Sequence, residues 1–74
     1  MRIKLTKEQV ARCLKVKERH PPHYAKARNL QRALARGFAN DCTYKELGEL
    51  YSITPEHART LVRRYVDRVE LILP

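Results

Sequence analysis

The chain has 74 residues, enough for one small domain and too few for a multi-domain enzyme. Sixteen Lys and Arg stand against eight Asp and Glu, and the resulting formal charge of +8 favours a polyanionic partner. No apolar run approaches the roughly 18 residues of a membrane span, and the N-terminus lacks the pattern of a secretory signal. We therefore expect a cytoplasmic protein without a membrane partner.

The two cysteines, Cys13 and Cys42, are expected to be reduced and to lie in the core. With His20 and His23 they suggest a zinc site, but tightly spaced ligand pairs such as C-x2-C are missing, so we expect no metal and no other cofactor. Ser52 is the only serine, and no nucleophile, base and acid occur in a recognisable local signature. We therefore expect no catalytic residues and a protein that is not an enzyme.

The first helix is predicted to begin at Lys7. Thr6 and Gln9 have the spacing of a capping box, in which a Thr side chain and a Glu or Gln three residues later satisfy two free backbone amides. The apolar face of this helix comprises Val10, Ala11, Cys13 and Leu14. Pro21 and Pro22 should end the helix, because proline lacks an amide donor and restricts the residue before it.

The second helix is predicted to run from about His23 to Arg36, in a segment rich in Ala, Leu, Arg and Gln. Gly37 is expected to be its C-cap. Apolar residues at intervals of three and four form a stripe that should face the core: Tyr24, Ala27, Leu30, Ala33 or Leu34, and Phe38.

Three arginines of this helix, Arg28, Arg32 and Arg36, recur every four residues and therefore line one ridge. Each adjacent pair of like charges costs about 0.2 to 0.5 kcal/mol in an isolated helix. Two interpretations stay open: a solvated surface, or a ridge that contacts phosphates.

A short third helix is predicted after a second capping box, formed by Thr43 and Glu46. It should extend for about two turns, through Leu47, Leu50 and Tyr51.

The last helix is predicted to have Thr54 as its N-cap and Pro55 as its first residue, where the fixed dihedral of proline suits helix entry. Apolar residues repeat along one face: Ala58, Leu61, Val62, Tyr65, Val66 and Val69. The polar residues left toward solvent are Glu56, Arg59, Thr60, Arg63 and Arg64.

The last two helices match the plan of a helix-turn-helix, whose second helix enters a DNA major groove. Gly48 is small where the second helix must approach closely, and Ile53 can plug the turn. Any small helical bundle contains such pairs, so geometry alone leaves DNA binding as one possibility among others. The sequence predicts an all-α single domain of four helices over residues 1–74, with the helix-turn-helix at about 43–69.

Residues 43–62, TYKELGELYSITPEHARTLV, resemble the C-terminal helix-turn-helix of bacterial sigma factors, the part that reads the promoter −35 element. They agree with that family in identity or type at Thr43, Glu46, Leu47, Gly48, Ile53, Thr54, Glu56, Ala58, Arg59 and Leu61. The resemblance implies a DNA-binding regulator of transcription in a bacterial cytoplasm or nucleoid. It also implies Glu56 and Arg59 as base-reading positions.

The chain departs from the sigma-factor pattern at Pro55, His57 and Thr60, where the family commonly carries Arg, Arg and Gln. These departures argue against recognition of the same promoter element. Compact phage-encoded transcription regulators are also similar to this chain.

For duplex DNA as the partner, Arg59 and Arg63 are expected to donate paired hydrogen bonds to guanine, and Glu56 to accept one from cytosine. Three more residues near the groove-facing end are candidates for base contact: Thr54, His57 and Thr60. Helix capping and solvation are the alternative interpretation of these three. The candidate phosphate contacts are Arg28, Arg32, Arg36, Lys45 and Arg64.

The charge is unevenly distributed along the chain. Residues 1–42 hold eleven Lys and Arg against three acidic residues, whereas residues 43–74 hold five of each. The N-terminal half would therefore have to supply the electrostatic attraction to DNA phosphates. If its arginine ridge points away from the last helix, the domain has a second surface suited to an acidic protein, which favours RNA polymerase as an alternative partner. RNA is a third alternative, although no RNA-binding signature is visible.

The two ends allow more than one interpretation. Residues 1–5 alternate apolar and basic residues, as a short strand does. Residues 71–73, LIL, either pack on the bundle or form a dimer contact, so monomer and homodimer both stay open.

Overall fold

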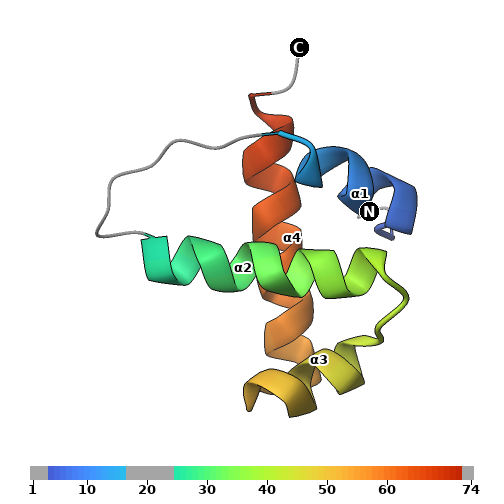
Figure 1. The fold of residues 1–74 in the computed structure, drawn as a ribbon, viewed down its shortest axis with the longest axis vertical. Coiled ribbons are helices and arrows are strands. Elements are labelled where there is room, and N and C mark those ends of the chain that lie inside the picture. The colour runs from blue at the N-terminus through green and yellow to red at the C-terminus, as the bar shows by residue number, and fades with distance from the viewer. Residues whose placement is uncertain (1–3, 17–24, 73–74) are drawn as a thin grey trace.

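A computed structural model describes residues 4–16 and 25–72, and Figure 1 shows the helices in this part of the chain. The elements are α1 (Lys7–Leu14), α2 (Ala25–Ala39), α3 (Tyr44–Tyr51) and α4 (Pro55–Glu70). No strand occurs within the described ranges, and residues 4 and 5 have no regular structure. The predicted all-α fold of four helices is therefore confirmed.

Helix α4 is the centre of the fold. It contacts each of the other helices, and α2 crosses it in Figure 1. All six residues of its predicted apolar face are buried: Ala58, Leu61, Val62, Tyr65, Val66 and Val69. The other helices complete the core with Val10, Cys13, Leu34, Ala35 and Leu47. Burying one such aliphatic side chain contributes about 1.5–3 kcal/mol, so the alternating spacing along α4 is the main reason for its position.

Helix α1 begins at Lys7, as predicted, and Thr6 Oγ1 accepts the Gln9 amide at 3.1 Å. The side chain of Gln9 does not complete the capping box, because it donates to the carboxylate of Glu70 at the end of α4. This bond joins the start of the first helix to the end of the last.

Helix α1 ends at Leu14, well before Pro21 and Pro22, so the prediction that the prolines end it is wrong. The chain leaves the helix through a tighter turn, in which the amides of Lys15 and Val16 bond to carbonyls three residues earlier. The prolines themselves lie outside the described residues.

Helix α2 continues three residues past its predicted end at Arg36, to Ala39. Gly37 lies inside the helix and is not its C-cap; the left-handed residue after the helix is Asp41, with φ 73°. A Cβ atom on Gly37 would lie 2.5 Å from Leu47 Cδ2. The glycine is therefore required by the close approach of α3, which no local pattern indicates.

The predicted apolar stripe of α2 is partly correct. Leu34 is buried, and Leu30, Ala33 and Phe38 are half-buried. Ala27 is exposed, contrary to the prediction, and Ala35 is buried in its place because α2 faces α1 and α4 together. Tyr24 lies outside the described residues.

Helices α3 and α4 form the predicted helix-turn-helix, joined by Ser52, Ile53 and Thr54. The capping box of α3 is complete, since Thr43 and Glu46 each accept the other's backbone amide at 3.1 Å. Thr54 Oγ1 accepts the amide of His57 at 3.1 Å and caps α4.

The turn itself depends on Gly48, where an added Cβ would lie 2.6 Å from the carbonyl oxygen of Ile53. Ile53 is half-buried and packs against the core. The predicted roles of both residues are confirmed. Tyr51 and Leu50, by contrast, are exposed.

Both cysteines are free thiols, and Cys13 is buried as predicted while Cys42 is half-buried. Burial raises the pKa of the Cys13 thiol above its ordinary value of 9.0; the Glu70 carboxylate acts in the same direction and Arg12 against it. The backbone carbonyl of Cys13 also accepts a hydrogen bond from the Tyr65 hydroxyl at 3.3 Å. This bond satisfies the one polar group on the largest core side chain.

At the C-terminal end, Leu71 and Ile72 are exposed, and Leu73 lies outside the described residues. At the other end, Leu5 packs against the core. Within residues 4–16 and 25–72, none of the helices combines the length and the apolar character that crossing a bilayer requires.

Candidate functional site

The side of α4 that the other helices leave uncovered is rich in arginine. Arg59, Thr60 and Arg64 are exposed there, and Arg63 is half-buried. Helical periodicity places these residues away from the buried face of the same helix. Four polar residues predicted from the sequence to face solvent thus share one surface with the exposed Glu56.

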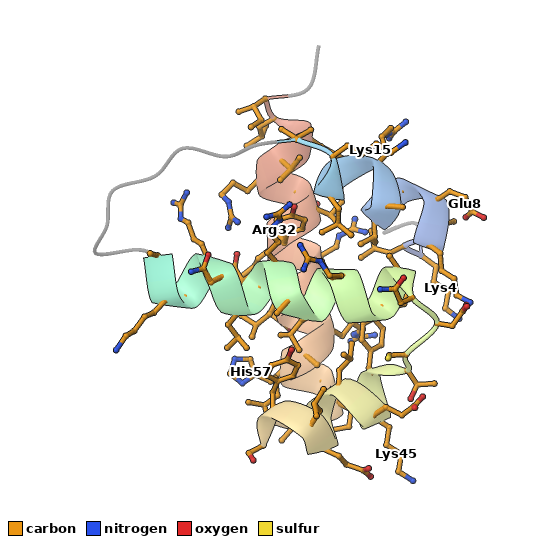
Figure 2. All side chains as sticks on the ribbon, in the orientation of Figure 1. Lys4, Glu8, Lys15, Arg32, Lys45 and His57 are labelled. Atoms are coloured by element: carbon orange, nitrogen blue, oxygen red, sulfur yellow. The ribbon has the colours of Figure 1, made fainter. Side chains whose placement is uncertain are left out.

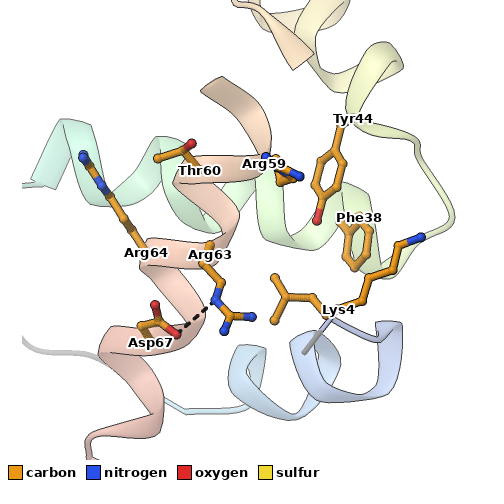
Figure 3. Close-up of a pocket in the computed structure, with 9 residues that line it drawn as sticks. Lys4, Phe38, Tyr44, Arg59, Thr60, Arg63, Arg64 and Asp67 are labelled. Atoms are coloured by element: carbon orange, nitrogen blue, oxygen red, sulfur yellow. Dashed lines mark ion pairs between the residues drawn. The ribbon is translucent and has the colours of Figure 1, made fainter. Parts of the chain in front are cut away.

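A cleft of about 300 Å³ opens beside this surface (Figure 3). Its walls come from four parts of the chain: Lys4 and Leu5 ahead of α1, Phe38 of α2, Tyr44 of α3, and Arg59, Thr60, Arg63, Arg64 and Asp67 of α4. Four cationic side chains therefore surround the cleft against a single carboxylate. Such a balance attracts anions.

Two aromatic rings form one wall of the cleft. Phe38 and Tyr44 are stacked, with ring centroids 5.0 Å apart and ring planes inclined by 6°. In Figure 3 the Tyr44 ring lies between Arg59 and Phe38. Burial raises the pKa of the Tyr44 hydroxyl above its ordinary value of 10.0, and the charges of Arg59 and Arg63 act in the opposite direction. The hydroxyl is thus protonated at neutral pH and can donate a hydrogen bond.

The arginines of α4 differ in their partners. Arg63 Nε lies 3.5 Å from Asp67 Oδ1, one helical turn away, and this pair holds its guanidinium along the helix (Figure 3). Within the described ranges, neither Arg59 nor Arg64 has an ion-pair partner. Their guanidinium groups are therefore available to an anion from outside.

The remaining candidates on this half of the molecule lie elsewhere. Lys45, Thr54 and His57 line a more open hollow beside the turn, together with Gly48 and Ser52. The Thr54 hydroxyl is already used to cap α4. The base-reading candidates are therefore divided between two depressions, and only Arg59, Thr60 and Arg63 come together in the cleft.

The arginine ridge of α2 has a different environment. Arg32 Nη2 donates to the carbonyl oxygen of Leu14 at 3.2 Å and thereby holds the end of α1. Arg28 is half-buried with contacts of its own, and Arg36 is exposed. Helix α2 lies against the buried face of α4, and in Figure 3 it passes behind α4, whereas Figure 2 shows Arg32 on the near side of the opposite view. The structure does not bring this ridge together with the exposed arginines of α4.

Sequence reasoning missed several residues of the cleft, namely Lys4, Phe38, Tyr44 and Asp67, as functional candidates. The spacing of Arg63 and Asp67 is a signal for their pairing, since residues four apart are neighbours on a helix. Nothing local indicates that Lys4 or Tyr44 approaches α4. Metal binding gains no support, because no three His, Cys, Asp or Glu side chains meet among the described residues; His20 and His23 lie outside them.

Comparison with protein-family models, with curated proteins and with solved structures finds no match to this chain. The resemblance of residues 43–62 to sigma factors therefore stays a prediction, and function has to be argued from the site itself.

Proposed function

We propose that the protein binds duplex DNA with α4 in the major groove and regulates transcription. The observation that carries the proposal is the position of Arg59, Thr60 and Arg63 on the uncovered side of a capped helix that follows a three-residue turn. A helix held in this way presents its polar face as a rigid unit, which is how helix-turn-helix proteins place side chains against base edges.

The side chains of this face suit distinct roles. Arg59, which has no ion-pair partner among the described residues, is long enough and planar enough to bond to guanine O6 and N7. Glu56 lies in the first turn of α4 and can accept a hydrogen bond from cytosine N4. Arg63 is positioned by Asp67 and contributes a second donor group.

The electrostatic attraction to phosphates is reassigned by the fold. Arg64 and Lys4 border the same cleft as the base-reading residues, and Lys45 lies beside the turn. The arginines of α2, which the sequence marks as phosphate contacts, lie on another side of the molecule, so a duplex docked on α4 would depend on the first group. Each phosphate neutralised contributes about 0.9 to the slope of log K against log salt.

The test is a selection from random duplex DNA followed by anisotropy titrations at several salt concentrations. Arg59→Gln and Arg36→Gln are a matched pair, because both remove one charge from an exposed helical position. We expect Arg59→Gln to weaken binding to the selected sequence by about 1–3 kcal/mol while leaving random duplex nearly unaffected. Arg36→Gln should leave both affinities close to those of the original chain.

Failure of the selection to enrich a sequence would contradict the proposal, as would equal losses in the two variants. An alternative has one observation in its favour: the α2 arginines form a second basic surface away from α4, which suits an acidic protein such as a subunit of RNA polymerase. Stoichiometric capture of RNA polymerase that is lost in Arg36→Gln and kept in Arg59→Gln would favour that alternative.

A further inference from the structure

We propose that the cleft beside α4 binds a small aromatic phosphate ester of the class of a mononucleotide, and that this ligand competes with DNA. The competition rests on the proposed function, whereas binding in the cleft does not. The inference is carried by one juxtaposition: arginines without ion-pair partners among the described residues lie opposite a stacked aromatic pair in an enclosed space.

The size of the cleft selects a small ligand. Its volume of about 300 Å³ lies at the lower end of ligand pockets, which span roughly 300–1,000 Å³. Walls from four separate parts of the chain surround it, with Lys4 and Tyr44 rising beside α4. A duplex lying across α4 cannot descend between these walls, but a single nucleotide can.

The anionic end of the ligand is assigned to Arg59 and Arg64. Planar guanidinium groups match the oxygen atoms of a phosphate and bond to it in pairs. The hydroxyl of Thr60 lies between these two arginines in the sequence of α4, and all three residues border the cleft. The Tyr44 hydroxyl, protonated at neutral pH, supplies a further donor.

The aromatic end of the ligand is assigned to the wall formed by Phe38 and Tyr44. Every nucleobase has a flat apolar face that stacks on such rings. Asp67 is the only carboxylate of the cleft, and it accepts hydrogen bonds from an amino group or a ribose hydroxyl while repelling a second anion. The cleft therefore distinguishes the two ends of its ligand, which a simple basic patch does not.

Isothermal titration calorimetry of the full chain with adenosine monophosphate tests the first half of the proposal. Ribose 5-phosphate, which lacks the base, and adenosine, which lacks the phosphate, are the matched ligands. We expect one site per chain, adenosine monophosphate at least tenfold tighter than ribose 5-phosphate, and no detectable heat from adenosine. Equal affinities for adenosine monophosphate, ribose 5-phosphate and inorganic phosphate would overturn the proposal, because they indicate a patch that attracts any anion.

Variants locate the site. Arg59→Gln should weaken adenosine monophosphate tenfold or more, and Arg36→Gln should change it less than twofold. Tyr44→Leu should reduce adenosine monophosphate to the level of ribose 5-phosphate, whereas Tyr44→Phe keeps the ring and should retain the preference for the base. Circular dichroism of each variant identifies loss of folding, and the Phe variant provides the reading if the Leu variant does not fold. An Arg36→Gln loss equal to that of Arg59→Gln would place the ligand elsewhere and overturn the assignment.

Competition is measured by adding adenosine monophosphate to the protein bound to its selected duplex. We expect half of the DNA to be released near the dissociation constant found by calorimetry, corrected for the DNA present. Binding of adenosine monophosphate without release of DNA would overturn the competition alone. Failure of the chain to bind DNA would refute the proposed function and leave the calorimetric result to decide the cleft.

Discussion

The two junctions on either side of α3 have the same construction. In each, a glycine lies in the last turns of the preceding helix, Gly37 before the first junction and Gly48 before the second. Four residues later the backbone becomes left-handed, at Asp41 with φ 73° and at Ser52 with φ 58°. The next amide in each junction, from Cys42 or Ile53, donates to the glycine carbonyl at 3.0 and 2.9 Å. A threonine then caps the next helix.

The junctions differ in what faces the glycine. A Cβ atom on Gly37 would meet the end of the Leu47 side chain, whereas one on Gly48 would meet the backbone oxygen of Ile53. A leucine terminus can move by rotating, but a carbonyl fixed by the turn cannot. The same local plan is therefore expected to be tolerant at the first junction and strict at the second.

The largest effect is expected for Gly48→Ala. The alanine should lower the free energy of unfolding by about 1–3 kcal/mol through the collision with the turn, which exceeds the helix-propensity gain of about 1 kcal/mol. Urea denaturation followed by circular dichroism measures the difference. Glu49→Ala, at the exposed neighbouring position, should change the unfolding free energy by less than about 0.5 kcal/mol.

Gly37→Ala is the counterpart at the first junction. Because Leu47 can adjust and alanine favours the helix, we expect a smaller loss than at Gly48, below about 1 kcal/mol. A loss at Gly37 equal to or greater than that at Gly48 would show that the packing of Leu47 is as rigid as the turn.

The caps give an intermediate effect of opposite rank. Thr43→Ala should cost about 1–2 kcal/mol and Thr54→Ala about 0.5–1 kcal/mol, measured in the same denaturation experiment. Thr43 makes two reciprocal bonds with Glu46, whereas Pro55 already removes one of the amides that Thr54 would otherwise help to satisfy. Equal losses would mean that the second bond of the capping box adds nothing.

Ser52→Gly should stabilise the fold by about 0.5–1 kcal/mol, because glycine adopts the left-handed backbone of this position without the steric cost that serine bears. Asp41→Gly is the comparison. It should gain less, since Asp41 also forms an ion pair with Lys7 and aspartate tolerates this backbone better than serine. A loss of stability in Ser52→Gly would indicate that the serine side chain has an unrecognised role in the turn.

The smallest effect concerns the residues after the two caps, Tyr44 and Pro55. The pKa of Tyr44 is raised in the fold, so above pH 10.0 the unfolded chain releases this proton first. Its contribution to stability is fully present below pH 10.0 and is lost as the pH rises toward the raised value. Tyr44→Phe should therefore show a shallower decline of unfolding free energy above pH 10, compared at equal salt. Parallel declines would contradict the assigned burial of the hydroxyl.

What the sequence predicts well is local. The caps at Thr6, Thr43 and Thr54 and the apolar repeat of α4 depend on neighbours within one or two turns, and the structure confirms them. The true end of α2 and the role of Gly37 depend on Leu47, which belongs to another helix, and α1 ends without a proline.

The candidate site shows the same division. Arg59, Thr60 and Arg63 follow from the exposed side of one predicted helix. The wall opposite them comes from Lys4, Phe38 and Tyr44, which meet α4 only through the packing of the whole domain. Charge counting was also misleading, because the helix with the most regular arginine spacing uses Arg32 to hold α1.

The turn between α3 and α4 also fixes how α4 is rotated about its own axis. An insertion of one residue between Gly48 and Thr54 would rotate α4 by about 100° relative to α3, exposing part of its apolar face and burying arginine. Insertions and deletions in this segment are therefore expected to abolish folding, whereas substitutions at its exposed positions are tolerated. Natural variants of this domain should differ there in residue type and hardly ever in length.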